Sequence, residues 1–372
     1  MNENNVRYRL PLMLLVMIAL LAALWGGLLR LGWKWPTLRP TLPVSHGPLM
    51  VSGFLGTLIG LERAVALSTL PQAGLERRWT YIGPLFSGLG AILIAAGVRG
   101  TIGPLLLTLG SVGLVAAFAL IIRRQPALFT VVMGLGAVVW LVGNALWLIE
   151  RPIHKIVLWW AGFLVLTIVG ERLELSRVLR LSRLSYSAFV LATALFLAGL
   201  GWTEFDLALG TRIAGASLLA LALWLLRNDI ARRTIRQTGL PRYIGFCLLS
   251  GYVWMGVSGV LALRFGLLVA GPHYDAMLHS LLLGFVFSMI FGHAPIIFPA
   301  VLGMPISFQP AFYVHLTLLH ASLLLRIVGD LASWVPGRQW GGLLNVLVVL
   351  LFLGTTAYSV FKGRNEPRFA GA

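Results

Sequence analysis

Long apolar stretches recur along the whole chain and are separated by short polar loops. Each is close to the roughly 20 residues that an α-helix needs to cross the hydrocarbon core of a bilayer. The pattern predicts an all-α polytopic membrane protein with about twelve transmembrane helices in one bundle. Because no polar stretch is long enough for a separate soluble domain, residues 1–372 are expected to form a single transmembrane domain. The predicted spans are 10–30, 46–68, 80–98, 101–122, 127–149, 154–172, 184–201, 207–227, 241–264, 276–299, 310–328 and 340–361.

Composition supports this prediction and excludes a water-soluble fold. Hydrophobic residues make up 58% of the chain, charged residues make up 11%, and the mean hydropathy is +0.89. A soluble domain carries about a quarter charged residues. The net charge of +17 would suggest a nucleic-acid partner in a soluble protein. Here the basic residues lie in short loops, so the expected partner is the lipid bilayer and no nucleic acid.

The distribution of basic residues predicts the orientation. Of the 29 Lys and Arg residues, 18 lie at the N-terminus, at the C-terminus or in loops after even-numbered spans. Ten lie on the opposite side, and Arg63 lies inside the second span. Basic loops stay in the cytoplasm. We therefore expect a multi-pass protein of a bacterial-type inner membrane with both termini in the cytoplasm.

The single cysteine, Cys247, narrows the choice of cofactor. One cysteine cannot form an intramolecular disulfide or a cluster of thiolate ligands for zinc or iron–sulfur centres. Without a CxxCH sequence, covalently attached c-type haem is also excluded. Cys247 lies in an apolar stretch and is interpreted as a packing residue.

Two histidines lie at the predicted outer ends of different spans. His46 begins the second span, and His279 lies in the first turns of the tenth. An ionisable side chain within a membrane span is costly and is by default a functional hypothesis. Two imidazoles from facing helices are typical axial ligands of a six-coordinate haem b. The alternative is that each histidine only forms hydrogen bonds at the membrane interface.

Three further histidines predict a second, inner layer. His293 lies 14 residues after His279, on nearly the same face if the helix is a regular α-helix. His315 lies in the eleventh span at a matching depth, and His320 lies between the two layers. With His315 or His320, His293 is a candidate ligand of a second haem or of copper. Structural roles remain open for all three.

Other polar residues add weaker candidates. Glu62 and Arg63 form an adjacent pair in the second span that suits either a structural role or a proton or anion relay. Arg326 and Asp330 are four residues apart, which favours an ion pair within one helix. Arg326 is also a candidate for holding haem propionates.

Pro295 and Pro299 are expected to break the tenth span beside His293. Such a break either shapes a cavity there or marks the end of the helix. Glu171, Arg172 and Glu174 are expected on a solvated cytoplasmic face.

With these features the chain resembles the NnrS family, whose members have twelve spans and are linked to haem, copper and nitric-oxide stress. It is more remotely similar to the catalytic subunit of haem–copper oxidases, in which the second and tenth helices bind a low-spin haem. That resemblance implies haem ligation by His46 and His279. The matching residues are His46, Leu49, Met50, Gly53, Phe54, His279, Gly284, Phe285, Gly292 and His293.

The chain departs from the pattern of the oxidases in two respects. The chain has no adjacent pair of histidines for copper, and His154 lies at the end of the sixth span rather than deep within it. Both departures argue against a dinuclear oxygen-reducing centre and against proton pumping.

The sequence thus favours a membrane protein that binds haem b, at one or two sites, with copper as a further candidate. It would act in electron transport or in handling nitric oxide or oxygen, with a quinol or a cytochrome subunit as candidate partner. Whether it is an oxidoreductase with turnover stays open. The alternatives are a twelve-span secondary transporter of a small molecule, and an assembly subunit whose histidines are structural.

Overall fold

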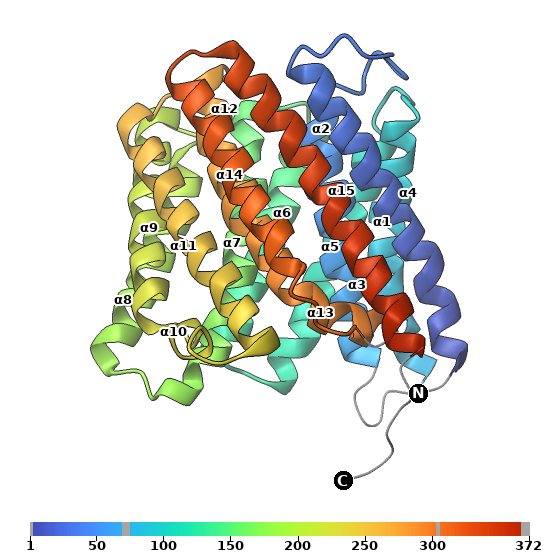
Figure 1. Cartoon of the computed structure of the whole chain (residues 1–372), viewed down its shortest axis with the longest axis vertical. Helices are drawn as coiled ribbons and strands as arrows, with labels where there is room; N and C mark the ends of the chain where they lie inside the picture. Colours follow the sequence, from blue (N-terminus) through green and yellow to red (C-terminus); the bar gives the residue numbers. More distant parts are fainter. Residues whose placement is uncertain (1–2, 69–74, 303–305, 366–372) are drawn as a thin grey trace.

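The structure, a computed structural model, describes residues 3–68, 75–302 and 306–365. These residues form helices and no strands. The helices run roughly along one axis, and the start of α1 and the end of α15 lie at the same end of the molecule (Figure 1). The elements are α1 (Glu3–Arg30), α2 (His46–Pro48), η1 (Leu49–Gly56), α3 (Thr57–Ser68), η2 (Leu75–Tyr81), α4 (Ile82–Ala95), α5 (Ile102–Arg124), α6 (Leu128–Leu148), α7 (Ile153–Ser176), η3 (Arg177–Leu179), α8 (Arg183–Trp202), α9 (Leu207–Asn228), α10 (Ala231–Thr234), α11 (Gly239–Phe265), α12 (Pro272–His279), η4 (Ser280–Phe287), α13 (Ser288–Leu302), α14 (Phe312–Leu331) and α15 (Val335–Asn365).

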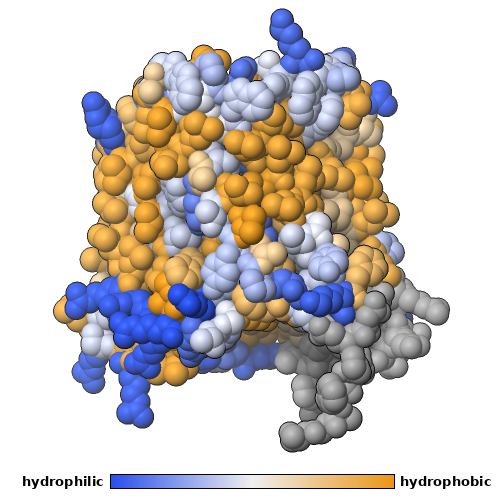
Figure 2. Space-filling model, viewed as in Figure 1, coloured by the Kyte–Doolittle hydropathy of each residue, from blue (hydrophilic) through white to orange (hydrophobic). Residues whose placement is uncertain are grey.

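The outer surface matches a bilayer. On the face that Figure 2 shows, apolar side chains cover most of the middle of the molecule, and hydrophilic side chains gather at its two ends. Within the described residues, eleven helices are long and apolar enough to span a membrane. The protein is therefore an all-α polytopic membrane bundle, as the hydropathy pattern predicts.

The predicted span 80–98 differs from the others. It forms α4, which has only 14 residues and rises about 21 Å, short of a full hydrocarbon core. Glycines allow α4 to lie close against α5: a Cβ on Gly83 would lie 3.3 Å from the carbonyl oxygen of Gly110, and one on Gly90 would lie 2.8 Å from that of Gly103. Among the described residues, α4 is thus a short helix beside eleven full-length spans, and α1 begins and α15 ends at the same end of the molecule (Figure 1).

Three helical spans form the centre of the bundle. The share of residues buried inside the protein is 72% in the apolar part of His46–Ser68, 67% in that of Ile153–Leu179 and 67% in that of Pro272–Pro299. By contrast, only 33% is buried in the spans that contain α5, α8 and α15. His46 and His279 thus lie on two of the three most enclosed spans.

Both of these spans contain a π-helical segment that hydropathy does not predict. In the first, η1 begins three residues after His46, and in the second η4 begins directly after His279. Tryptophans pack closely against both segments: a Cβ on Gly56 would lie 2.2 Å from the Trp140 ring, and one on Gly284 would lie 2.4 Å from Trp254. π-Helical turns are rare and frequently occur at functional sites.

Candidate functional site

His46 and His279 face each other in the end of the bundle opposite the start of α1. Their ring centroids are 6.2 Å apart, and their planes differ by 20°. Rings in face contact would be closer, so a gap separates the two imidazoles. A metal ion midway between two opposed imidazole nitrogens, with bonds of about 2 Å, would separate the ring centroids by roughly 6 Å. The observed separation matches this arrangement.

Both imidazoles are oriented through Nδ1. The Nδ1 of His46 donates to the carbonyl oxygen of Ala23 at 2.7 Å, and the Nδ1 of His279 donates to that of Asp275 at 3.0 Å. These acceptors favour the tautomer whose Nε2 has a free lone pair. No hydrogen bond to either Nε2 is present among the described residues. Metal-ligating histidines characteristically use their second nitrogen in this way.

The two histidines line a cavity of about 320 Å³, within the range of small-molecule sites. Its walls are largely apolar, with Leu24, Met50 and Val349 among them. Glycines leave room at His46: a Cβ on Gly27 would lie 2.9 Å from the imidazole ring, whereas one on Gly47 would meet nothing within 4 Å. Gly27 on α1 therefore leaves the space that the His46 ring occupies.

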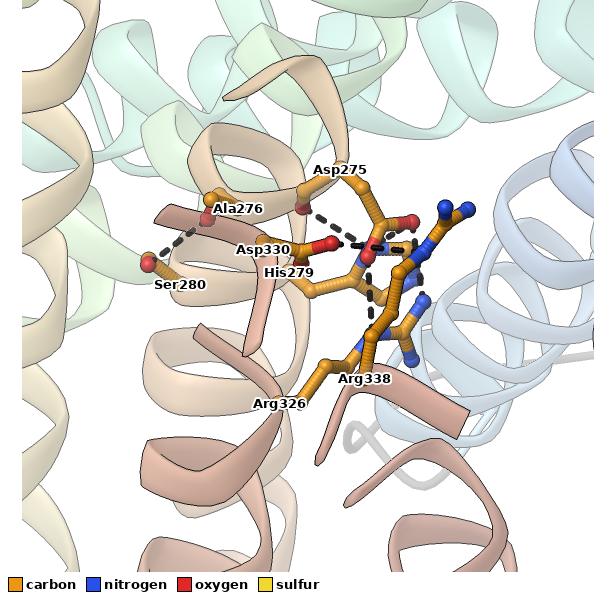
Figure 3. Close-up of polar contacts among 7 residues, drawn as sticks. All are labelled: Asp275, Ala276, His279, Ser280, Arg326, Asp330 and Arg338. Atoms are coloured by element: carbon orange, nitrogen blue, oxygen red, sulfur yellow. Dashed lines mark hydrogen bonds and ion pairs between the residues drawn. The ribbon is translucent and has the colours of Figure 1, made fainter. Parts of the chain in front are cut away.

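Charged residues line part of the cavity, and Figure 3 shows the contacts among several of them. The guanidinium of Arg326 holds Asp275 through two hydrogen bonds of 2.8 and 2.9 Å. A second pair joins Arg338 and Asp330 at 3.2 Å. Asp275 also lies 3.2 Å from the Nδ1 of His279. The predicted ion pair between Arg326 and Asp330 is wrong, because each residue pairs with a neighbouring segment instead.

Two further arginines line the cavity without a pair of hydrogen bonds to a carboxylate. Arg30, on α1, and Arg338, on α15, both line it, and Arg30 is exposed. Arg326 lines it too, but Asp275 occupies two of its nitrogens. Carboxylates of a ligand would thus meet cationic groups on this side of the cavity.

The inner histidines do not assemble with one another. The Nε2 of His293 lies 3.0 Å from Arg172, and its Nδ1 lies 2.6 Å from the carbonyl oxygen of Met289. Arg172 is only 3% exposed, so the expectation of a solvated position for it is wrong. In a regular α-helix His293 would lie on nearly the same face as His279. The intervening η4 has more residues per turn, which changes the face that His293 occupies.

The other two inner histidines have separate partners. His315 is buried, and its two nitrogens contact Tyr243 at 2.9 Å and Thr355 at 3.3 Å. His320 accepts a hydrogen bond from Trp254 at 3.0 Å, and its Nε2 has no partner among the described residues. Across the described part of the chain, no group of three or more His, Cys, Asp or Glu residues is placed to hold a metal ion.

Two further predictions concern the adjacent pair Glu62 and Arg63 and the prolines of the tenth span. Arg63 pairs with Glu171 and lies 3.6 Å from Glu62, so the predicted local pair extends to a second helix. The expected break at Pro295 and Pro299 is wrong for the described residues, because α13 continues through both to Leu302.

Some residues of the cavity were not identified from the sequence as site residues. Gly27, Arg30 and Arg338 line it from helices that carry no predicted ligand. His154, at the end of the sixth predicted span, also lines it. The position of Asp275, four residues before His279, is the one local signal in the sequence that indicates a contact with the imidazole.

Comparison with known protein families gives a match over nearly the whole chain. A family model described as "Domain of unknown function (DUF8744)" matches residues 9–361. No curated protein matches the chain. The family match thus covers both histidines and the cavity, and its description names no activity.

Proposed function

The chain belongs to the DUF8744 family, and from the geometry of the histidine pair we propose that it is a haem b-binding membrane protein. In this proposal His46 and His279 are the axial ligands. The single observation that carries it is the pair of imidazoles whose ring centroids lie 6.2 Å apart, with no hydrogen bond to either Nε2 among the described residues.

The number of protein ligands favours haem over a bare metal ion. Zinc or copper in a protein site is held by three or four side chains. Here two imidazoles face each other, and the described residues offer no third ligand of that kind. Haem would bring four further donors of its own, so two protein ligands would be enough.

The surrounding residues have distinct roles in this proposal. The Ala23 carbonyl and the carbonyl and carboxylate of Asp275 fix the two imidazole planes. Gly27 leaves space for the His46 ring. Arg30 and Arg338 offer cationic partners for propionate groups.

A haem held by two imidazoles supplies reversible one-electron transfer. With His46 and His279 both ligating the iron, the site would leave no position for nitric oxide or oxygen. The site therefore favours electron transfer over gas handling, with a quinol or a cytochrome subunit as candidate partner. We do not extend the proposal to a second haem or to copper, because His293 and His315 use both ring nitrogens in other contacts.

The proposed location is a bacterial-type inner membrane, with both termini in the cytoplasm. The excess of basic residues on the side of the termini supports this orientation. The histidine pair then lies toward the outer face, so its redox partner would act from that side.

The test is haem content in the purified protein. The reduced-minus-oxidised absorption spectrum and the haem-to-protein ratio are measured for the wild type and for His46→Ala and His279→Ala. We expect a b-type band in the wild type and its loss in both variants. His273→Ala is the matched control. His273 lies on the same helix as His279, but its ring packs against that of Phe265, with the two ring centroids 4.1 Å apart.

Two results would contradict the proposal. One is a colourless protein from haem-replete cells, which would favour the transporter. The other is a b-type band that persists in both variants. Size-exclusion profiles of all samples distinguish loss of haem from loss of the fold.

A further inference from the structure

A second, larger cavity lies at the other end of the molecule. It has a volume of about 780 Å³ and lies between the segment after α7, the start of α8, the end of α9 and α10. In Figure 2 hydrophilic side chains gather in this region directly below the apolar surface. The cavity thus lies where a membrane surface meets water, far from the histidine pair.

Arginine dominates the lining. Five arginines line the cavity, and the one carboxylate among the lining residues is Asp229. Asp229 is 1% exposed and accepts a hydrogen bond from the backbone of Ala231 at 2.7 Å. The five arginines are Arg180, Arg227, Arg232, Arg233 and Arg236.

The five arginines have no ion-pair partner in the part of the chain that the structure describes. Within the described residues, none of the five forms an ion pair with a carboxylate, although Arg63, Arg177, Arg326 and Arg338 do so elsewhere. The side chain of Arg232 is also oriented, because it donates to the carbonyl oxygen of Arg227 at 2.9 Å. Guanidinium groups recognise phosphate oxygens through paired hydrogen bonds.

One wall of the cavity is apolar and faces outward. Leu184 is 81% exposed, and Leu223 is 60% exposed. Both line the cavity, at the ends of α8 and α9. A ligand that fits here has a phosphate group for the arginines and a hydrocarbon part for the leucines.

We propose that this basic cavity binds the headgroup of an anionic phospholipid from the adjacent leaflet, with its acyl chains against Leu184 and Leu223. The volume and the number of arginines suit a headgroup with two phosphates, so diphosphatidylglycerol should bind more tightly than phosphatidylglycerol. Basic pockets between membrane helices on the cytoplasmic side bind such headgroups in general.

The experiment is lipid binding to the full chain in detergent, followed by native mass spectrometry and by thermal stability. The probes are diphosphatidylglycerol, phosphatidylglycerol, phosphatidylcholine and inorganic phosphate. The test variant is Arg232→Gln with Arg233→Gln. The matched control is Arg123→Gln with Arg124→Gln, which removes the same charge from an exposed pair at the end of α5.

We expect diphosphatidylglycerol to bind the wild type and the control equally, and to bind the test variant about 30-fold more weakly. Equal weakening in both double variants would mean a diffuse charge effect and would overturn the proposal. Equal protection by inorganic phosphate would assign the site to free phosphate rather than to lipid. We expect haem content to be unchanged in either double variant, because the arginines lie far from the histidine pair, so this test and that of the histidine pair are independent.

Discussion

The Nδ1 of His279 lies 3.2 Å from a carboxylate oxygen of Asp275, which precedes it by one helical turn. The same carboxylate is held by Arg326 through two hydrogen bonds. A carboxylate on the second nitrogen of a ligating histidine fixes the ring and raises the basicity of the ligand. Asp275 is therefore a positioning residue for the proposed haem ligand.

The first prediction concerns Asp275→Asn. The neutral amide is a weaker acceptor, so His279 becomes a poorer donor to ferric iron and the midpoint potential rises. Loss of a group that holds the second nitrogen of a ligating histidine weakens metal binding by about 10- to 100-fold. Redox titration and haem retention measure the two effects.

Asp330→Asn is the control for this prediction. Asp330 is buried near the same cavity, but its partner is Arg338 rather than a histidine. Its replacement should leave the potential unchanged. An equal shift in both variants would mean that the general charge of the region, not the contact to His279, sets the potential.

The second prediction concerns Gly27→Ala. The added Cβ would lie 2.9 Å from two atoms of the His46 ring, so the imidazole must move. We expect the haem-to-protein ratio to fall by more than half while the helical fold remains. Gly354→Ala provides the control, because a Cβ there meets nothing within 4 Å and Ala favours a helix by about 1 kcal/mol. Full haem content in Gly27→Ala would show that the ring position is not critical.

The third prediction separates the inner histidines from the outer pair. His293→Ala and His315→Ala should retain the b-type spectrum, because their nitrogens contact Arg172, Tyr243 and backbone or hydroxyl oxygens. Each loss leaves a buried polar partner unsatisfied and should cost about 1–3 kcal/mol of stability. Thermal unfolding and the spectrum are recorded on the same samples. A haem signal that disappears in either variant would restore the inner site.

The fourth prediction is a pH dependence from Asp229. Burial raises the pKa of this carboxyl group above its ordinary value. The folded protein then binds more protons than the unfolded chain, so stability falls as pH rises from the ordinary aspartate value through the raised pKa. In Asp229→Asn this fall should disappear, because the amide does not titrate. A thermal midpoint measured against pH gives the comparison, and identical profiles for both proteins would rule out the assignment.

The sequence predicted the elements better than their internal geometry. Apolar stretches of about 20 residues placed eleven of the helices, because length and hydropathy alone decide whether a segment can cross a bilayer. The meeting of His46 and His279 was also predictable, because both lie at the same end of helices that pass through one bundle. The short α4 was not, since close packing of its glycines against α5 is a tertiary effect.

Two effects, one local and one tertiary, prevented a correct prediction of where the inner histidines lie and what they contact. The π-helical segment η4 lies between His279 and His293, so counting at 3.6 residues per turn misplaces the second histidine. Arg172 and Tyr243 come from helices far away in sequence, and no spacing rule indicates that they meet His293 and His315. Arg172 and Tyr243 contact the Nε2 of His293 and the Nε2 of His315, respectively, so neither nitrogen is free for a metal.

The most direct test of the central claim is the spin state of the oxidised protein, measured by electron paramagnetic resonance. Two imidazoles with planes 20° apart predict a low-spin ferric signal in the wild type. His46→Ala and His279→Ala should each lose this signal, leaving either high-spin ferric haem or no haem. A wild-type protein without low-spin haem, or variants that keep the low-spin signal, would contradict ligation by the two histidines.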